Sequence, residues 1–214
     1  MLIDFEPAIR TAIASILSET VIRGCFFHFA QCIWRKVQDL GLVTAYKQNS
    51  SLRKTVRRIA ALPLMPLNAL GRLWHLLRAQ GPVDVPRMPE LFDYVQTTWI
   101  NNDALFEPRM WNQFENNGSR TNNSVEGFNF RINNLIRIRR PSIFRLILAL
   151  QRTQMQNEIG LARLMQGGRA RRRQRRYRDS DVRLERLKDM LMADEIDVFK
   201  YLDECSTCIK MGKI

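Results

Sequence analysis

Apolar residues recur three and four positions apart along most of the chain, which is the spacing of amphipathic helices. This spacing predicts helices over residues 4–20, 30–42, 50–62, 67–81 and 90–101. A short run rich in β-branched and aromatic residues, VIRGCFFHF at 21–29, predicts a buried strand instead. The residues MLI at 1–3 are expected as the stub of a second strand. The pattern therefore predicts an α-rich α/β fold.

Turn and capping residues predict where these helices end. Pro7 suits the first turn of the first helix, and Gly41 is expected to stop the second. A serine is expected to cap the helix that ends before Pro63. After Pro141, a helix capped by Ser142 should run to Gln166, a length of about 37 Å. Residues 180–202 predict one or two loosely docked helices.

The excess positive charge of the chain is concentrated in one segment. The chain has 214 residues, 45% of them hydrophobic, and a net charge of +13. Residues 120–178 hold 15 Arg, no Lys and two acids, so this segment alone accounts for the excess, and the remaining 19 bases and 19 acids cancel. Arginine binds phosphate through two donors at once, so a phosphate-facing surface is favoured over a merely solvated basic helix. The arginines assigned to nucleic-acid binding are Arg120, Arg131, Arg137, Arg139, Arg140, Arg171, Arg172, Arg173, Arg175 and Arg176.

Composition also excludes several classes of protein. No apolar run approaches the ~20 residues of a transmembrane helix, and the N-terminal residues lack a signal-peptide pattern. Four cysteines in a chain of this length indicate a reducing compartment rather than a disulfide scaffold. We therefore expect a nucleic-acid partner, no membrane and no small-molecule substrate, and a nuclear location if the arginine run at 169–178 is an import signal. The arginine run at 169–178 could serve as an import signal, a DNA contact, or both.

The stretch RTNNSVEGFNFRINN, residues 120–134, holds one carboxylate among five asparagines. As a helix over 123–137 it places an apolar face opposite a polar stripe. The apolar face comprises Val125, Phe128, Ile132, Leu135 and Ile136, and the polar stripe comprises Asn122, Glu126, Asn129 and Asn133. Spacing leaves two interpretations of Glu126 open: a capping acid in the first helical turn, or a metal ligand presented from a rigid helix.

Three motifs in order resemble a known family. The first is IDFEPAI, the second is GCFFHFAQCIWRKVQDLGLVTAY with Cys25 and His28 as a Cys-x-x-His pair, and the third is RTNNSVEGFNFRIN. Together they resemble the C-terminal two-thirds of a Mutator-like element (MULE) transposase domain. The resemblance covers residues 4–150, and it is the ordered set rather than any single motif that is specific.

The resemblance implies a partial ribonuclease H-like core with a helical insertion and three catalytic acids that hold paired Mg²⁺ or Mn²⁺ ions. Asp4 matches the second acid and Glu126 the third, while Cys25 and His28 match the family's pair near the active centre. Such metals activate the attacking oxygen and stabilise the leaving oxygen. The chain begins three residues before Asp4, so we expect the first acid to be missing and the chain alone to be inactive.

The expected organisation has three parts. Residues 1–150 form a truncated transposase domain with a helical insertion at about 47–110, residues 151–178 a basic helix and arginine-rich linker, and residues 179–214 a helical tail. Three functions stay open: a transposase remnant that binds DNA, a domesticated non-catalytic nucleic-acid-binding protein, and a helical interaction protein with a basic tail. Self-association is also left open.

The cysteines allow one further metal site. Cys25, His28, Cys205 and Cys208 together would make a Cys₃His zinc set, since Cys-x-x-Cys has ligand spacing. Ordinary buried thiols and a C-terminal Cys-x-x-Cys without metal are the favoured alternative.

Overall fold

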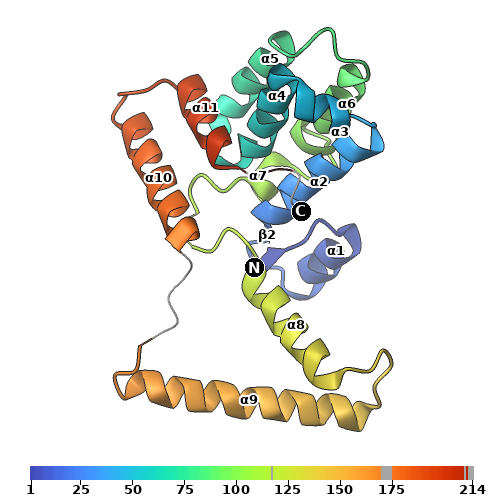
Figure 1. Ribbon diagram of the computed structural model, residues 1–214, viewed down its shortest axis with the longest axis vertical. Coiled ribbons are helices and arrows are strands. Elements are labelled where there is room, and N and C mark those ends of the chain that lie inside the picture. Colours follow the sequence, from blue (N-terminus) through green and yellow to red (C-terminus); the bar gives the residue numbers. More distant parts are fainter. Residues whose placement is uncertain (117, 170–174, 210, 212–214) are drawn as a thin grey trace. The chain divides into compact units, whose positions relative to one another are not determined.

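The computed structural model divides the chain into two compact units (Figure 1). Unit 1 comprises Met1–Thr121 and Asp179–Ile214, and unit 2 comprises Asn122–Arg178. The structure describes residues 1–116, 118–169, 175–209 and 211. Within them the secondary structure is predominantly helical with two short strands, so the predicted α-rich class is confirmed.

Unit 1 begins with a parallel β-α-β arrangement. Strand β1 (Leu2–Ile3) pairs with β2 (Arg23–Gly24), with Leu2 opposite Arg23 and Ile3 opposite Gly24. Parallel strands need a crossover, which α1 (Pro7–Ile16) supplies. The pairing continues beyond β2, because the Cys25 amide donates to the Ile3 carbonyl at 2.8 Å. The predicted strand stub at residues 1–3 is therefore confirmed.

The strand predicted over 21–29 is confirmed only at Arg23–Gly24 and is wrong for the rest of that run. Helix α2 (Phe26–Asp39) starts directly after its N-cap residue, Cys25. The helical period places Phe29, Ile33 and Val37 on one fully buried face, and burial of that face outweighs the strand preference of a short apolar run. A run of this kind cannot be assigned to strand or helix by periodicity alone.

An all-helical segment follows, as predicted. Its elements are α3 (Val43–Gln48), α4 (Ser50–Ala61), the 3₁₀ turns η1 (Leu62–Leu64) and η2 (Leu67–Ala69), α5 (Leu70–Ala79), α6 (Met88–Val95), the π-helical turn η3 (Gln96–Ile100) and α7 (Pro108–Trp111). The predicted serine cap of α4 is wrong, because the Asn49 side chain accepts the Leu52 amide at 3.0 Å. Asparagine reaches the free amides of a first turn as well as serine does.

An aromatic cluster lies where the β-α-β segment meets the helices. We define it as Phe5, Phe29, Trp99, Phe106 and Trp111. Ring centroids are 4.7 Å apart for Phe5 and Trp99, and 5.0 Å apart for Phe29 and Trp111. The Trp111 indole also donates to the backbone carbonyls of Trp99 and Phe106, both at 3.1 Å. The cluster thus joins three stretches that are distant in sequence, at residues 5, 29 and 99–111.

The C-terminal helices belong to this core. Helix α10 (Arg175–Met192) begins in the last four residues of unit 2 and continues in unit 1. Helix α11 (Val198–Cys208) lies wholly in unit 1 and packs along α4 (Figure 1). Leu202 and Cys205 are fully buried there. The expectation of loosely docked helices is therefore wrong for α11, whose apolar face closes a core that earlier helices leave open.

A buried ion pair fixes α11 on α4. The Arg58 guanidinium, 8% exposed, contacts one oxygen of Asp203, and the Lys54 ammonium lies 3.1 Å from the other. Burial alone would raise the pKa of Asp203, but hydrogen bonds from Arg58 and Lys54 outweigh it and hold the pKa below its usual value. The carboxylate is therefore charged at neutral pH and neutralises the charge of the buried Arg58.

Unit 2 consists mainly of two helices, both predicted. Helix α8 (Asn123–Ile136) packs on α9 (Ile143–Met165), which begins after Ser142. The Ser142 hydroxyl accepts the Arg145 amide at 3.5 Å, as expected for the cap. Gly167 adopts φ +85° after the last turn, a conformation that glycine reaches without strain, so the predicted stop is confirmed.

Several apolar faces remain exposed. Helix α1 has no buried residue, and Ile16 at its end is 79% exposed. On the predicted apolar face of α8 only Ile132 is buried, whereas Val125 and Phe128 are exposed. None of the described helices combines the length and apolar character that crossing a bilayer requires.

Glycine is required at position 24. A Cβ atom there would overlap two carbons of the Phe5 ring, which the aromatic cluster holds in place. We expect Gly24→Ala to lower the free energy of unfolding by about 1–3 kcal/mol through overpacking. Urea denaturation followed by circular dichroism measures this change.

Gly71→Ala is the matched control, since nothing lies within 4 Å of the added methyl group. Gly71 lies in α5, where alanine should leave stability unchanged or raise it by up to ~1 kcal/mol. Equal stability of Gly24→Ala and the wild type would contradict a fixed Phe5 ring.

Candidate functional site

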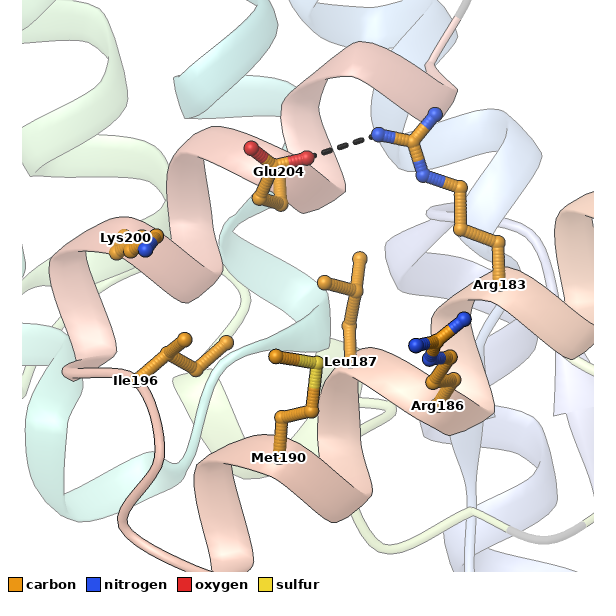
Figure 2. A pocket seen from close by; sticks show the side chains of 7 residues that line it. All are labelled: Arg183, Arg186, Leu187, Met190, Ile196, Lys200 and Glu204. Carbon is orange, nitrogen blue, oxygen red and sulfur yellow. Dashed lines mark hydrogen bonds and ion pairs between the residues drawn. The ribbon is translucent and has the colours of Figure 1, made fainter.

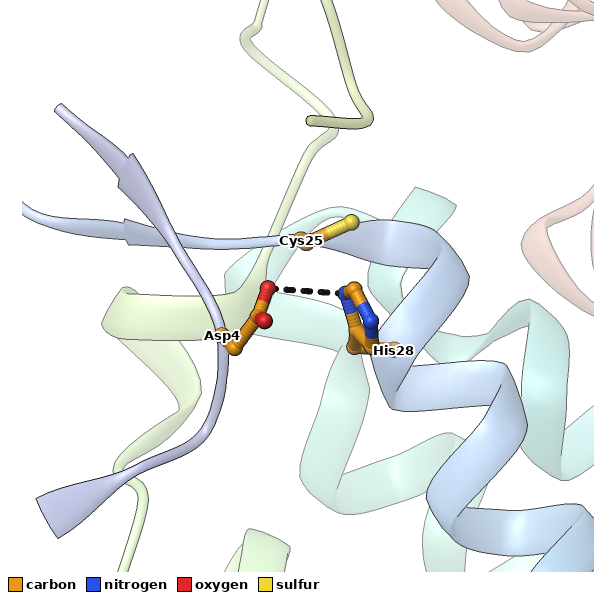
Figure 3. Close-up of side chains that lie close together, drawn as sticks. All are labelled: Asp4, Cys25 and His28. Carbon is orange, nitrogen blue, oxygen red and sulfur yellow. Dashed lines mark ion pairs between the residues drawn. The ribbon is translucent and has the colours of Figure 1, made fainter. Parts of the chain in front are cut away.

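Three potential metal ligands converge in unit 1. Asp4 follows β1 directly, Cys25 follows β2 and caps α2, and His28 lies in the first turn of α2 (Figure 3). One ligand atom of each lies within 4.8 Å of the others. Among the described residues this is the only such group of three or more His, Cys, Asp and Glu side chains. We call it the Asp–Cys–His cluster.

The cluster is half enclosed. The His28 Nδ1 atom lies 2.8 Å from an Asp4 carboxylate oxygen. The Cys25 thiol is fully buried, the His28 side chain is 19% exposed, and the Asp4 side chain is 41% exposed. Access from solvent is thus from the carboxylate side, with the thiol at the closed end.

Backbone hydrogen bonds from remote segments position the cluster. The Gln113 side chain donates to the Gly24 carbonyl at 2.7 Å, and the Gln113 amide donates to the Pro63 carbonyl at 2.7 Å. The Phe26 amide donates to the Arg120 carbonyl at 2.9 Å. The main chain of Gly24, Cys25 and Phe26 is thus hydrogen-bonded to three other parts of the chain, at Gln113, Ile3 and Arg120.

The donor set decides which metals suit the cluster. A carboxylate, a thiol and an imidazole are ligands that Zn²⁺ takes, whereas Mg²⁺ prefers oxygen ligands and retained water. The cluster by itself therefore fits Mg²⁺ or Mn²⁺ poorly. The prediction of those ions rests on Asp4 together with Glu126, and it stays a prediction.

The other cysteines are not part of the cluster. Cys205 and Cys208 lie on α11, so the structure does not assemble the four-residue Cys₃His set. Burial raises the pKa of Cys205 to about 12, so its thiol stays protonated. Cys32 lies one turn after His28 on α2, and burial raises its pKa as well, with Arg35 opposing and Asp4 adding to the shift.

Glu126 lies in unit 2, in the first turn of α8, with an exposed side chain. This is the helical position predicted for it. Asp4 belongs to unit 1, so the pairing of the two acids as catalytic residues stays a prediction.

The arginines divide between the units. Arg120 lies in unit 1 and forms an ion pair with Asp181, and its assignment to nucleic-acid binding stays a prediction. Within unit 2, Arg131, Arg137, Arg139 and Arg140 are exposed, and so is Arg175. Arg171, Arg172 and Arg173 lie outside the described residues, as does the side chain of Arg176.

A row of arginines along α9 was not singled out from the sequence. Arg145, Arg152 and Arg163 are seven and eleven residues apart, so at 100° per residue they share one helix face within about 20°. All three side chains are exposed. The spacing of seven and eleven residues could have indicated this row. It is informative only when residues 145–163 are taken as one helix.

Two shallow pockets lie away from the Asp–Cys–His cluster. One lies between α10 and α11, where Leu187, Met190 and Ile196 form an apolar floor (Figure 2). At its rim Arg183 binds Glu204 at 2.8 Å, which neutralises part of the positive charge. The other lies between α8 and α9 within unit 2, beside Phe128 and Thr153.

Comparison of the chain with protein-family models, curated proteins and solved structures finds no match. Function must therefore be inferred from the residues themselves.

Gln113 is a positioning residue that no pattern in the sequence singles out. Its side chain is buried, and Gln113→Leu would leave the Gly24 carbonyl without this donor. We expect a loss of about 1–3 kcal/mol in the free energy of unfolding, the cost of an unsatisfied buried acceptor. Thermal and urea denaturation measure this loss.

Gln38→Leu is the control, because Gln38 is an exposed residue of α2. Its effect should stay within about 0.5 kcal/mol. A Gln113→Leu protein that is as stable as this control would remove the positioning role.

Proposed function

We propose that this chain is a transposase-derived, nuclear DNA-binding protein that contacts the phosphate backbone through unit 2. The observation that carries the proposal is that one compact unit, unit 2, holds nearly all of the net positive charge. Unit 2 holds 14 arginines, no lysine and two glutamates, a net charge of +12. Unit 1 holds the other 20 bases against 19 acids. A compact body with this charge is suited to a polyanion.

The arrangement of the arginines supports DNA as that polyanion. All ten arginine side chains described in unit 2 are exposed, where they can reach phosphate oxygens. Helix α9, with 23 residues, is about 34 Å long, close to one turn of B-form DNA. Its row of three arginines is spaced ~10 and ~16 Å along the axis. Phosphate contacts carry no sequence information, so binding should be insensitive to sequence.

The order of elements supports a transposase origin. Asp4 stands directly after a strand of a parallel β-α-β arrangement, an all-helical segment from Phe26 to Trp111 follows, and Glu126 comes next in the first turn of α8. This is the order that the MULE resemblance implies for a ribonuclease H-like core with a helical insertion. We propose that unit 1 is a partial core of that type.

A second candidate function is a domesticated, non-catalytic nucleic-acid-binding protein. It is favoured by the surroundings of Asp4, whose near neighbours in the Asp–Cys–His cluster are an imidazole and a thiol rather than further carboxylates. DNA binding without cleavage is common to both candidates.

DNA binding should depend steeply on salt. Replacing Arg145, Arg152 and Arg163 together by glutamine should weaken binding to a random duplex and flatten the plot of log affinity against log salt. At ~0.9 for each phosphate that is no longer neutralised, the slope should fall by up to about 2.7. Fluorescence anisotropy between low and physiological salt measures both quantities.

A control triple removes the same charge from unit 1. Arg35, Arg72 and Arg109 are exposed there, and their joint replacement by glutamine should change the slope by less than about one. If both triples behave alike, the net charge rather than unit 2 governs binding. If the wild-type affinity does not respond to salt, the phosphate interaction itself is excluded.

The chain alone should not cut DNA. With Mg²⁺ or Mn²⁺ present, supercoiled plasmid should stay intact over the concentration range that gives full binding, because two carboxylates hold a metal pair poorly. Asp4→Ala and Glu126→Ala should be indistinguishable from wild type in this assay. Nicking by the wild-type chain that both variants abolish would instead establish a working metal site.

A further inference from the structure

We propose that the Asp–Cys–His cluster binds a thiophilic divalent cation, Zn²⁺, through the Asp4 carboxylate, the Cys25 thiolate and the His28 imidazole. In this proposal Asp4 coordinates Zn²⁺ rather than the Mg²⁺ that the resemblance implies. It is independent of phosphate binding by unit 2. A water molecule would complete the tetrahedron at the exposed side of the cluster.

The geometry is close to that of a zinc site. Zinc bonds of 2.0–2.3 Å place tetrahedral ligand atoms about 3.3–3.8 Å apart. In the cluster, the Asp4 and His28 atoms lie 2.8 Å apart and no pair exceeds 4.8 Å. Adjustments of about an ångström or less, within the reach of side-chain rotation, would centre the three atoms on one ion.

The surroundings also favour zinc. Cys25 is fully buried and its backbone is fixed at the end of the strand ladder, so the softest ligand is presented rigidly. Cys25 and His28 are three residues apart across the start of α2, which places both on the same side of its first turn. Asp4 arrives from β1 on the other side (Figure 3). Thiolate and imidazole together select Zn²⁺ over Mg²⁺.

The metal site would stabilise the crossover between the two strands. Asp4 and Cys25 bracket the crossover that contains α1, and α1 has no buried residue. The two strands have two residues each, and only Ile3 and Gly24 of them are buried. A segment with so little buried surface gains little from packing. A metal that joins both ends of the crossover to α2 would stabilise it through coordination instead, because binding free energy adds to folding free energy.

The test is metal binding by the full chain. The protein, freed of metal by a chelator, is titrated with Zn²⁺ and separately with Co²⁺. We expect one equivalent of Zn²⁺ per chain, a thiolate-to-cobalt charge-transfer band with Co²⁺, and a higher thermal midpoint with either ion. Millimolar Mg²⁺ should displace neither. Cys25→Ser, His28→Gln and Asp4→Asn should each weaken zinc binding by on the order of 100-fold or more.

Matched controls use the same residue types elsewhere. Cys208→Ser, His75→Gln and Asp103→Asn should bind zinc like wild type, since these residues lie outside the cluster. Cys32→Ser tests the nearest other thiol on α2 and should also retain the cobalt band. No bound zinc in the wild-type chain, or a cobalt band that survives Cys25→Ser, would overturn the proposal, and neither result depends on variants folding. The salt dependence of DNA binding should be the same with and without zinc, so the two proposals can fail separately.

Discussion

Burial of five aromatic rings is the interaction on which the rest of unit 1 depends. The rings come from three stretches of the chain, at residues 5, 29 and 99–111, and their edge-to-face and stacked contacts fix those stretches together. The rings are those of Phe5, Phe29, Trp99, Phe106 and Trp111. Phe5 immediately follows Asp4 and Phe29 immediately follows His28. The packing of these rings therefore also determines where two of the three potential ligands lie. Gly24 has no side chain because the Phe5 ring occupies that space.

A second constraint is the return of the chain to unit 1 after unit 2. Helix α11 supplies Tyr201, Leu202 and Cys205 to the core and sets Asp203 against the buried Arg58. Without this helix, α4 would expose an apolar face, and Arg58 would lose its carboxylate partner. Unit 1 is thus discontinuous in sequence, and unit 2 is an insertion that leaves the core of unit 1 intact. An inserted body can carry a charge of +12 because none of that charge has to be buried.

The two proposals therefore concern different physical problems. Unit 2 presents exposed guanidinium groups, which gain free energy by releasing counterions from a polyanion. The Asp–Cys–His cluster instead brings unlike ligands together beside helix α1, which has no buried residue, and there coordination would compensate for missing apolar contacts. Neither requires the catalytic use of Glu126, whose place in the first turn of α8 is equally compatible with a favourable interaction with the helix N-terminus.

Local sequence determined which segments are helical, where Gly41 and Gly167 end helices, and which segment holds the charge. These features depend on neighbours within a few residues. The strand prediction over 21–29 was wrong because strand preference is a local property. The burial of Phe29, Ile33 and Val37 depends instead on helices that come later in the chain. Cys25 and His28 were visible as a pair, and Asp4 as a strand-end acid, yet only the tertiary structure brought all three together. Asp4 and Cys25 lie on either side of a whole crossover, and no periodicity encodes a contact made across it. Gln113 shows the same limit, since its partner at Gly24 is 89 residues away.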